Sequence, residues 1–422
     1  MGAVTTRADA DRCPGVLRPH RAEDGALLRI RIPGGRVAGP ALRQLSEASR
    51  RYADGDVQLT SRANLQLRGV QTNDDGTVVG GLVDALAAAG LLPHPSHDRV
   101  RNIMCSPLTG LAGGRADLRP ALAALDAAIG RAPDLAALPG PFLIALDDGR
   151  GDLGITRADL AAIAVGDDRV RIWAGGVQGP ELPLAAAVPF LFGLARRFVD
   201  LGSTAWHIRE LPGGGRGFLA LTDPTDPTDP TDPADRAGDD GTAADAPASP
   251  ADRTPLGMLG QQNGRMIASV LVPLGRLSGA QVDALADAAS VGQGRLIVTP
   301  WRGMLVPDLP SPVALTGLIG QGLIADDGSG WRGVTACPGS RCARGAGDTD
   351  GPARQVAARP GRSTLLPVHV VACSRGCGQP SGRHVLALIT RSGVEIRCDD
   401  RAVHAGADEA ADIVGALREG AR

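Results

Sequence analysis

The sequence contains no lysine, so all 44 of its basic Lys/Arg-type side chains are arginine. The simplest cause is the general bias of this composition toward Ala, Gly, Arg and Pro. Whatever the cause, the absence excludes a lysine Schiff base, a P-loop lysine and a lysine general base. We therefore expect any bound anion to be held by guanidinium groups or by backbone N–H groups.

Aromatic residues and net charge are also scarce. Phe, Trp and Tyr together make up 2% of the chain, and the formal net charge is −2 at pH 7. A surface for stacking nucleic-acid bases needs aromatic side chains, and general nucleic-acid binding needs a large excess of basic residues. We therefore expect no nucleic-acid partner.

Long hydrophobic runs are missing as well. No stretch reaches the ~18 apolar residues that predict a membrane helix, because the best candidate, 182–195, is interrupted by Pro183 and Pro189. The N-terminal residues include Asp9 and Asp11 and form no hydrophobic signal segment. These features predict a cytoplasmic protein without a membrane partner, and 422 residues predict two or three domains.

A repetitive segment divides the chain. The triplet Thr-Asp-Pro occurs four times in succession from 222 to 233, and an Asp/Ala/Pro-rich stretch continues to about Thr254. Proline removes backbone donors, and aspartate adds charge that cannot be buried. This composition predicts an extended, solvated linker.

The two parts on either side of the linker resemble each other. In the first, strand-like residues 27–33 precede a helical pattern at 39–53 and strand-like residues 57–62. In the second, residues 267–273, 278–289 and 295–299 repeat this order. Pro33 precedes Thr60 by 27 positions, and Pro273 precedes Thr299 by 26. The matching order and spacing predict a duplicated β-α-β unit in a mixed α/β fold.

Four of the seven cysteines form two close pairs. The segment CPGSRC spans 337–342 and CSRGC spans 373–377. An odd total without a signal segment argues against a disulfide scaffold. Three interpretations stay open: a [4Fe–4S] cluster, a structural Cys₄ zinc site, or unrelated structural cysteines. The adjacent Arg341, Arg344 and Arg375 would suit a cluster.

Several motifs resemble the sulfite/nitrite reductase superfamily. TSRANLQLRG at 60–69 is similar to its Thr-x-Arg-x-x-x-Gln signature, and RNIMCSP at 101–107 to its Arg-Asn segment. Within the superfamily, TPWRG at 299–303, LDDGRGD at 146–152 and RELP at 209–212 resemble the precorrin-3B synthase branch. The resemblance covers most of 25–215 and 255–395.

The resemblance implies an enzyme and its cofactors. Cys337, Cys342, Cys373 and Cys377 would bind a [4Fe–4S] cluster. The reaction would be an O₂-dependent hydroxylation of the tetrapyrrole precorrin-3A with closure of a γ-lactone, in aerobic cobalamin synthesis. An NADH-linked reductase or a ferredoxin would donate the electrons. A second, non-haem iron is implied too; His207, His369 and His384 are candidates for its ligands, and none is assigned.

The resemblance also implies a fold and domain boundaries. We expect duplicated ferredoxin-like half-domains and two α/β/α domains of the sulfite/nitrite reductase type, related by a pseudo-twofold axis. The expected segments are a flexible leader (1–24), a first half-domain (25–75), a first α/β/α domain (76–220), a disordered linker (221–254), a second half-domain (255–310) and an iron–sulfur α/β domain (311–422).

Six residues are predicted to bind the carboxylates of the substrate. They are Arg62, Asn64, Gln66, Arg68, Arg101 and Arg302. Arginine holds a carboxylate with two parallel hydrogen bonds, which motivates the four arginines. Each has an ordinary alternative: a surface ion pair for Arg62, Arg68 and Arg101, a turn cap for Asn64 and Gln66, and a brace of the core for Arg302. The acids Asp147, Asp148 and Asp152 are interpreted as a solvated turn rather than as catalytic acids, because Gly149 and Gly151 lie between them.

Two departures from the family pattern bear on function. Four residues separate Cys337 from Cys342, where the family usually has five. The reductases place basic residues near the segment LPGPFL at 138–143, where this chain has Pro141 and Leu143. Reduction of a small oxyanion needs concentrated positive charge, so this difference favours the precorrin branch. A sirohaem-dependent sulfite or nitrite reductase and a zinc-stabilised non-catalytic protein remain the alternatives.

Overall fold

The computed structural model describes residue 11 and residues 13–22, 24–220, 254–342, 344–359, 366–380 and 382–420. The predicted linker at 221–254 lies outside this part of the chain except for Thr254, which is buried. None of the described helices is long and apolar enough to cross a membrane.

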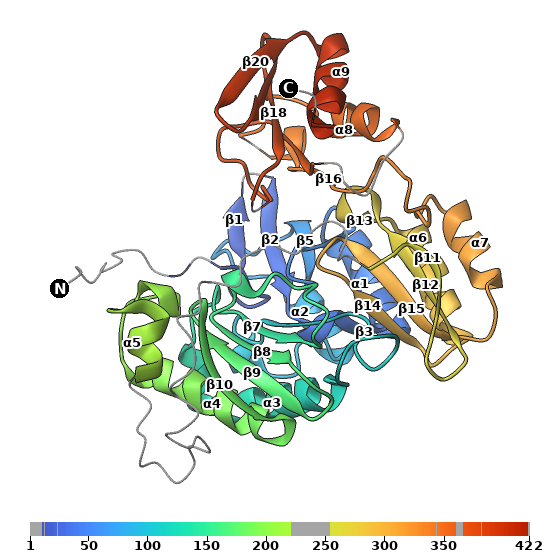
Figure 1. Ribbon diagram of the computed structural model, residues 1–422. Coiled ribbons are helices and arrows are strands. Elements are labelled where there is room, and N and C mark those ends of the chain that lie inside the picture. Colours follow the sequence, from blue (N-terminus) through green and yellow to red (C-terminus); the bar gives the residue numbers. More distant parts are fainter. Residues whose placement is uncertain are drawn as a thin grey trace.

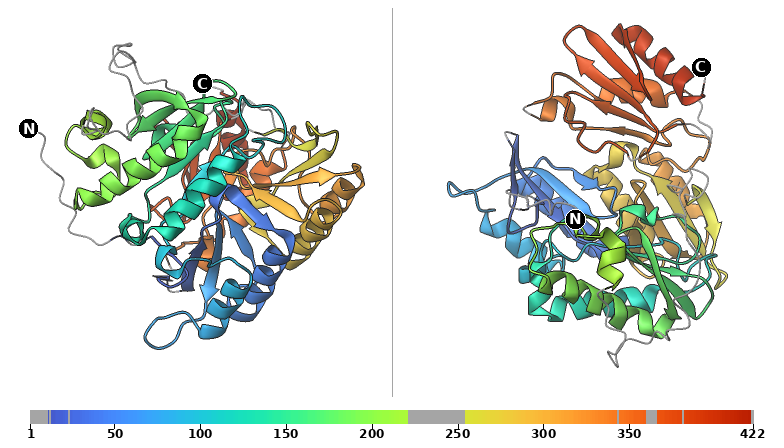
Figure 2. Two further views of the ribbon diagram at one scale, coloured as in Figure 1. Left: turned by 90° about the horizontal axis from the view of Figure 1, so that it is seen from below. Right: turned by 60° about the vertical axis from the view of Figure 1, so that its left-hand side comes forward.

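Four five-stranded sheets organise the described residues (Figure 1). Two of them form a central pair, one lies below in the view of Figure 1, and the C-terminal sheet stands above the others, as both Figure 1 and Figure 2 show. This arrangement is the mixed α/β fold with internal duplication that the sequence predicts.

The first central sheet carries the first half of the predicted repeat. Its own strands are β1 (His20–Ala22), β2 (Gly25–Ile30), β4 (Val57–Leu59) and β5 (Leu65–Val70), and its helices are α1 (Gly39–Tyr52) and α2 (Gly80–Ala88). Helix α1 starts with Pro40 in its first turn, where the missing N–H costs nothing. It buries Leu42, Leu45 and Ala48, whose spacing puts them on one face.

The second central sheet repeats this design. Its own strands are β11 (Gly257–Gly260), β12 (Met266–Leu271), β14 (Arg295–Val298) and β15 (Gly303–Leu309), and its helices are α6 (Gly279–Ser290) and α7 (Val313–Gly320). A capping box begins α6: the Ser278 hydroxyl accepts from the N–H of Gln281, and the Gln281 side chain accepts from the N–H of Ser278. Val282, Leu285 and Ala289 of α6 are buried, as α1 buries its own apolar face.

The two half-domains exchange a strand with each other. β3 (Arg36–Ala38) belongs to the first repeat but pairs with β14 of the second sheet, and β13 (Arg276–Leu277) of the second repeat pairs with β4 of the first. Helices α1 and α6 pack together, where Arg43 forms ion pairs with Asp283 and Asp287. The reciprocal exchange makes one continuous core, which the sequence pattern does not reveal.

The other two sheets share a second duplication. One consists of β6 (Ile103–Cys105), β7 (Ile144–Asp147), β8 (Leu160–Ala164), β9 (Arg169–Ala174) and β10 (Val177–Pro183) with helices α3 (Arg119–Arg131), α4 (Leu184–Asp200) and α5 (Gly214–Ala220). The C-terminal one consists of β16 (Val334–Ala336), β17 (Val368–Val371), β18 (Val385–Thr390), β19 (Gly393–Cys398) and β20 (Arg401–Ala405) with α8 (Asp350–Ala357) and α9 (Ala407–Arg418). In both, the first two pairings are parallel and the last two antiparallel.

Short 3₁₀ turns connect these elements. They are η1 (Pro33–Gly35), η2 (Pro95–His97), η3 (Pro133–Ala137), η4 (Ile155–Arg157), η5 (Ile208–Glu210), η8 (Pro273–Gly275) and η9 (Gly339–Arg341). η1 and η8 occupy matching places in the two half-domains, each between a strand and the exchanged strand.

Of the leader predicted at 1–24, the structure describes residues 11, 13–22 and 24. Asp11 forms an ion pair with Arg99 at 2.9 Å, and Val16 is buried in the core of the half-domains. Asp98 accepts hydrogen bonds from the backbone N–H groups of Val16 and Leu17. Residues 14–16 are therefore buried against the body, next to the partly buried carboxylate of Asp98.

Candidate functional site

A cavity of about 310 Å³ lies between the two central sheets and the two α/β domains. Its walls come from the loop after β4, the loop after β7, the loop after β14, the start of β16 and the second cysteine loop. Its lining includes Arg62, Arg157, Trp301, Arg302, Asp152 and Gln379. Because both half-domains and both α/β domains contribute lining residues, we take this cavity as the candidate functional site.

The loops after β4 and β14 are structural equivalents. The Thr60 hydroxyl accepts from the N–H of Asn64 at 3.0 Å, and the Thr299 hydroxyl accepts from the N–H of Gly303 at 3.0 Å. Ala63 and Arg302 both adopt positive φ, 54° and 60°. Arg302 is thus the counterpart of Ala63. Trp301, which precedes it, is the counterpart of Arg62.

Two guanidinium groups line the cavity from opposite repeats. The Nη1 of Arg62 donates to the carbonyl oxygen of Pro141 at 2.9 Å. Among the described residues, no hydrogen bond or ion pair is found for the Arg302 side chain, and burial lowers its pKa to about 10. Burial also lowers the pKa of Arg62. Both side chains remain cationic near neutral pH, so the cavity favours an anionic ligand.

The acidic loop after β7 is buried, which corrects the expectation of a solvated turn. Asp147, Asp148 and Asp152 are each at most 1% exposed. Asp147 accepts hydrogen bonds from the N–H groups of Gly149 and Gly151, and Asp148 pairs with Arg150 at 2.7 Å. One arginine thus stands among three carboxylates.

Asp152 is the member of this loop that reaches the cavity. Its Oδ1 accepts from the Ser106 hydroxyl at 2.7 Å, and its Oδ2 is buried without a hydrogen-bond partner. Arg150 Nε stands 3.8 Å from that oxygen. Burial, followed by the charge of Asp147, raises the pKa of Asp152 to about 7. The carboxyl can therefore hold a proton beside the cavity near neutral pH.

The other four predicted binding residues do not line this cavity. Asn64 accepts from the N–H of Ile32 and donates to Asn102. Gln66 hydrogen-bonds to Gln58 and Arg29. Arg68 pairs with Asp24 at 2.8 Å, and Arg101 donates to both carboxylate oxygens of Asp126 at 2.6 and 2.8 Å.

The structure therefore brings Arg62 and Arg302 together and holds the other four in contacts within the protein. Arg157, Trp301, Asp152 and Gln379 line the cavity although the sequence does not predict that they bind there. The loops that begin at Thr60 and Thr299 are equivalent, and this equivalence would have identified Trp301, the counterpart of Arg62, as a residue of the cavity. No local pattern marks Arg157 or Gln379.

The four cysteines lie on two neighbouring loops. Cys337 follows β16, and the loop with Cys373 and Cys377 follows the adjacent parallel strand β17. The Cys337 sulfur accepts from the N–H groups of Gly339 at 3.3 Å and Ala372 at 3.4 Å. Burial raises the pKa of this thiol, and the nearby Cys373 and Cys377 raise it further. Amide donors of this kind stabilise thiolate bound to metal.

The two cysteine loops bear on which metal group they could hold. Among the described residues, no three or more His, Cys, Asp or Glu side chains are already placed as ligands of one metal ion. In a [4Fe–4S] cluster each of the four cysteines binds a different iron. The donor set, the paired loops and the amide donors fit such a cluster.

The second duplication relates the cysteine loops to the acidic loop. Ser106 follows β6 as Cys337 follows β16, and each N–H donates to the neighbouring strand, at Leu146 and at Val370. The Ser106 hydroxyl accepts from the N–H of Asp148 just as the Cys337 sulfur accepts from that of Ala372. The acidic loop thus occupies the place in the first domain that the cysteine loop occupies in the second.

The three histidines that are candidates for a second iron have other partners. His207 lies 3.1 Å from Asp159, and His384 hydrogen-bonds to Gln379. The Nε2 of His369 donates to the carbonyl oxygen of Cys377 at 3.0 Å, and burial lowers its pKa to about 4. His369 therefore braces the second cysteine loop as a neutral ring.

Comparison with known proteins identifies the central repeats. The profile of the "Nitrite/Sulfite reductase ferredoxin-like half domain" matches residues 18–84 and 259–312. The chain carries two nitrite/sulfite reductase ferredoxin-like half domains. The predicted fold class is confirmed, and the coarser part of the resemblance, the nitrite/sulfite reductase superfamily, is supported.

Several known proteins are similar to this chain. A ferredoxin–nitrite reductase of Synechococcus elongatus is 28% identical over 414 residues, covering 89% of this chain and 78% of the relative. A precorrin-3B synthase of Sinorhizobium sp is 28% identical over 204 residues, covering 46% of this chain and 42% of the relative. The solved structure of the Mycobacterium tuberculosis NirA protein superposes with a TM-score of 0.66 at 19% identity, covering 93% of this chain and 80% of that one. The last likeness supports the fold alone.

Proposed function

We propose that this protein is an iron–sulfur monooxygenase of the precorrin-3B synthase type. It would hydroxylate precorrin-3A with O₂ and close a γ-lactone. One oxygen atom of O₂ enters the substrate and the other leaves as water, with two electrons and two protons supplied by an external donor. The partial relative named precorrin-3B synthase and the character of the cavity wall support this choice.

The observation that carries the proposal is the position of Leu143. Its buried side chain lines the cavity together with Met104 and Leu153. The family resemblance implies basic residues in this segment in the reductases, where they would hold a small oxyanion. Apolar side chains and arginines in one lining suit instead a large ring with carboxylates at its edge.

Four cysteines would hold the cluster. Cys337, Cys342, Cys373 and Cys377 supply its thiolates, and Gly339 and Ala372 supply amide donors. When bound, a cluster of this kind supplies single electrons to the site. The loop of Cys377 borders the cavity through Gly378 and Gln379.

Residues of the cavity would do the remaining work. Arg62, Arg157 and Arg302 would bind and orient the carboxylates of the substrate. Met104, Leu143 and Leu153 would exclude water from its apolar face. Asp152 would hold a proton on Oδ2, the atom without a partner, and deliver it when oxygen is reduced.

A second candidate function is nitrite reduction with sirohaem. It is favoured by the relatives that match the longest stretches of this chain, among them the ferredoxin–nitrite reductase of Zea mays, 27% identical over 84% of this chain. The same cavity would then hold sirohaem. The two candidates differ in whether the tetrapyrrole is substrate or cofactor.

The decisive experiment measures whether an oxygen atom of O₂ enters the product. Anaerobically reconstituted protein is mixed with precorrin-3A, a reductant and ¹⁸O₂, and the product is examined by mass spectrometry. The proposal expects one ¹⁸O atom in the product. No oxygen gain with an intact cluster, together with ammonium formed from nitrite by sirohaem-loaded protein, would establish the second candidate instead.

The cluster assignment is tested by iron content. We expect about four iron atoms per reconstituted chain and a marked loss of iron in C337S and C373S. C398S is the matched control, because Cys398 lies at the end of β19 and outside both loops. Stoichiometric zinc in place of iron would support the non-catalytic alternative.

A further inference from the structure

A second, larger cavity lies away from the site described above. It encloses about 670 Å³ and shares no lining residue with the first cavity. The exchanged strand β3, the start of α3, the turn between β11 and β12, and strand β14 form its walls. Its volume is in the range of small-molecule sites.

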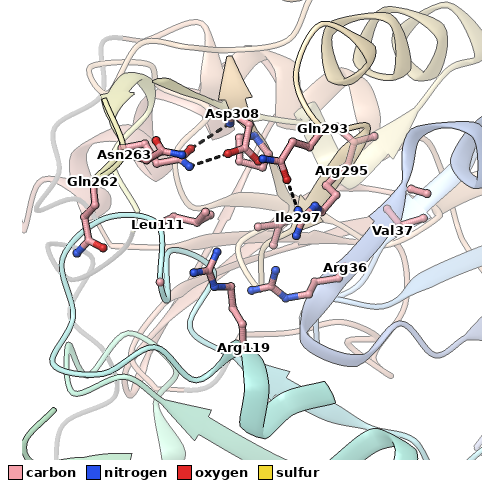
Figure 3. Close-up of a pocket in the computed structure, with 15 residues that line it drawn as sticks. Arg36, Val37, Leu111, Arg119, Gln262, Asn263, Gln293, Arg295, Ile297 and Asp308 are labelled. Atoms are coloured by element: carbon pink, nitrogen blue, oxygen red, sulfur yellow. Dashed lines mark hydrogen bonds between the residues drawn. The ribbon is translucent and has the colours of Figure 1, made fainter. Parts of the chain in front are cut away.

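Three arginines from different elements converge on this cavity. Figure 3 shows the guanidinium groups of Arg36 and Arg119 side by side, with Arg295 close by. Arg36 comes from β3, Arg119 from α3 and Arg295 from β14. Arg36 and Arg295 meet here because β3 pairs with β14 across the two half-domains.

The positive charge is only partly compensated. Arg119 pairs with Asp117 at 2.7 Å, and Arg295 hydrogen-bonds to the neutral Gln293. No hydrogen bond or ion pair of the Arg36 side chain is found among the described residues, and its Nε is buried without a partner. Burial lowers the pKa of Arg36, and the charges of Arg119 and Arg295 lower it further. An anion between these groups would relieve their mutual repulsion.

Neutral polar groups also line the cavity. Gln262 and Asn263 border it, and so does Gln293, which accepts a hydrogen bond from Arg295. The acid in the lining, Asp308, already accepts a hydrogen bond from Gln261 at 2.7 Å. None of the described residues that line the cavity is aromatic, so they offer no ring-stacking surface for a nucleobase. The lining therefore suits a compact anion with polar substituents.

The arginines also face a neighbouring cavity. A space of about 660 Å³ on the other side is lined by the same Arg36, Arg119 and Arg295. There Arg101 is already paired with Asp126. The three guanidinium groups thus stand between two openings, and a ligand with more than one anionic group could reach them from either.

We propose that the Arg36–Arg119–Arg295 cavity binds a small polyanion bearing two or more carboxylate or phosphate groups. The site is separate from the proposed oxygenase cavity and does not depend on the function proposed for it. The three arginines supply charge-assisted hydrogen bonds, and the amides of Gln262 and Asn263 bind the uncharged polar part.

The test is titration calorimetry of the full chain with two probes, citrate for carboxylates and tripolyphosphate for phosphates. We expect at least one to bind with a dissociation constant below about 1 mM at low salt, and R36Q/R295Q to weaken it by about tenfold or more. R196Q, which alters an exposed arginine paired with Asp134, is the matched control and should change affinity less than about twofold.

Two further variants keep the result interpretable. R62Q alters the first cavity and should leave the affinity unchanged. R295Q alone alters an exposed side chain, so we expect the core to stay folded and binding still to weaken several-fold. The proposal is overturned if neither probe binds, if R36Q/R295Q and R295Q bind as the parent does, or if R62Q abolishes binding.

Discussion

At the scale of single residues, the charged groups in and beside the cavities of this protein are arginines and buried aspartates. Arg36, Arg62 and Arg302 are all partly buried, and burial lowers the pKa of each. Guanidinium starts from so high a pKa that it stays charged, whereas a buried lysine would tend to lose its proton. A chain without lysine therefore keeps fixed cations in its cavities.

Asp152 leads to a prediction about pH. Its pKa is about 7 in the folded protein against an ordinary 3.8, so between these values the folded chain binds an extra proton. The free energy of unfolding should fall as pH rises from 4 to 7, by up to about 1.4 kcal/mol per pH unit. D152N, which resembles the neutral acid and keeps an acceptor for Ser106, should lack most of this slope.

Urea unfolding at pH 5 and pH 8 measures this difference. D134N serves as the control, because Asp134 is a partly exposed residue in a surface ion pair and should leave the slope as it is in the parent protein. An equal loss of stability with pH in D152N and the parent would show that Asp152 is ionised throughout.

At the scale of elements, the turns before the exchanged strands are tightly built. Gly35 of η1 has φ +71°, and a Cβ there would collide with the carbonyl oxygen of Val298 in the other half-domain. Gly275 of η8 has φ +68° and lies against Arg302. Only glycine permits such backbone conformation and close approach together.

The substitution G35A tests this turn. Positive φ alone costs alanine about 1–2 kcal/mol, and the collision should add to it, so we expect a loss of at least about 3 kcal/mol in free energy of unfolding. G55A is the matched control, since Gly55 has φ +92° but a Cβ at this position would meet nothing within 4 Å. Equal losses in denaturant titrations of the two variants would contradict the close packing of η1.

At the scale of the whole molecule, a few polar contacts join the C-terminal domain to the half-domains. Arg276 of the exchanged strand β13 pairs with Asp350 at the start of α8, with Nη1 2.6 Å from Oδ2. Arg341 beside the first cysteine pair approaches both Asp350 at 3.3 Å and Asp56 at 3.9 Å. The strand exchange thus also positions the cysteine domain.

R276Q should loosen this connection. We expect faster amide hydrogen exchange in residues 334–357 and a stability loss of about 1–3 kcal/mol, because Asp350 would lose a partly buried partner. R43Q is the control: it removes a more exposed ion pair between α1 and α6 and should leave exchange in 334–357 unchanged. Equal exchange in R276Q and R43Q would show that apolar packing alone holds the domain.

Much of the architecture was predictable because it follows from neighbours in the sequence. The helix expected at 39–53 is α1 (Gly39–Tyr52), and that expected at 278–289 is α6 (Gly279–Ser290). Their apolar residues recur with helical spacing, and this spacing is local information. The pairing of cysteines in two short loops is equally local. Strand exchange is not, since β3 and β13 are three and two residues long and pair with distant partners.

The sequence by itself therefore determined the periodic elements, the duplication, the exclusive use of arginine and the two cysteine pairs. Tertiary structure alone decided which arginines face a cavity: Arg68 and Arg101 meet Asp24 and Asp126, while Arg62 and Arg302 line the first cavity. It also buried Asp152. The physical reason is that helical and strand periodicity depend on adjacent residues, whereas the burial and pairing of a charge depend on which distant segments fold over it.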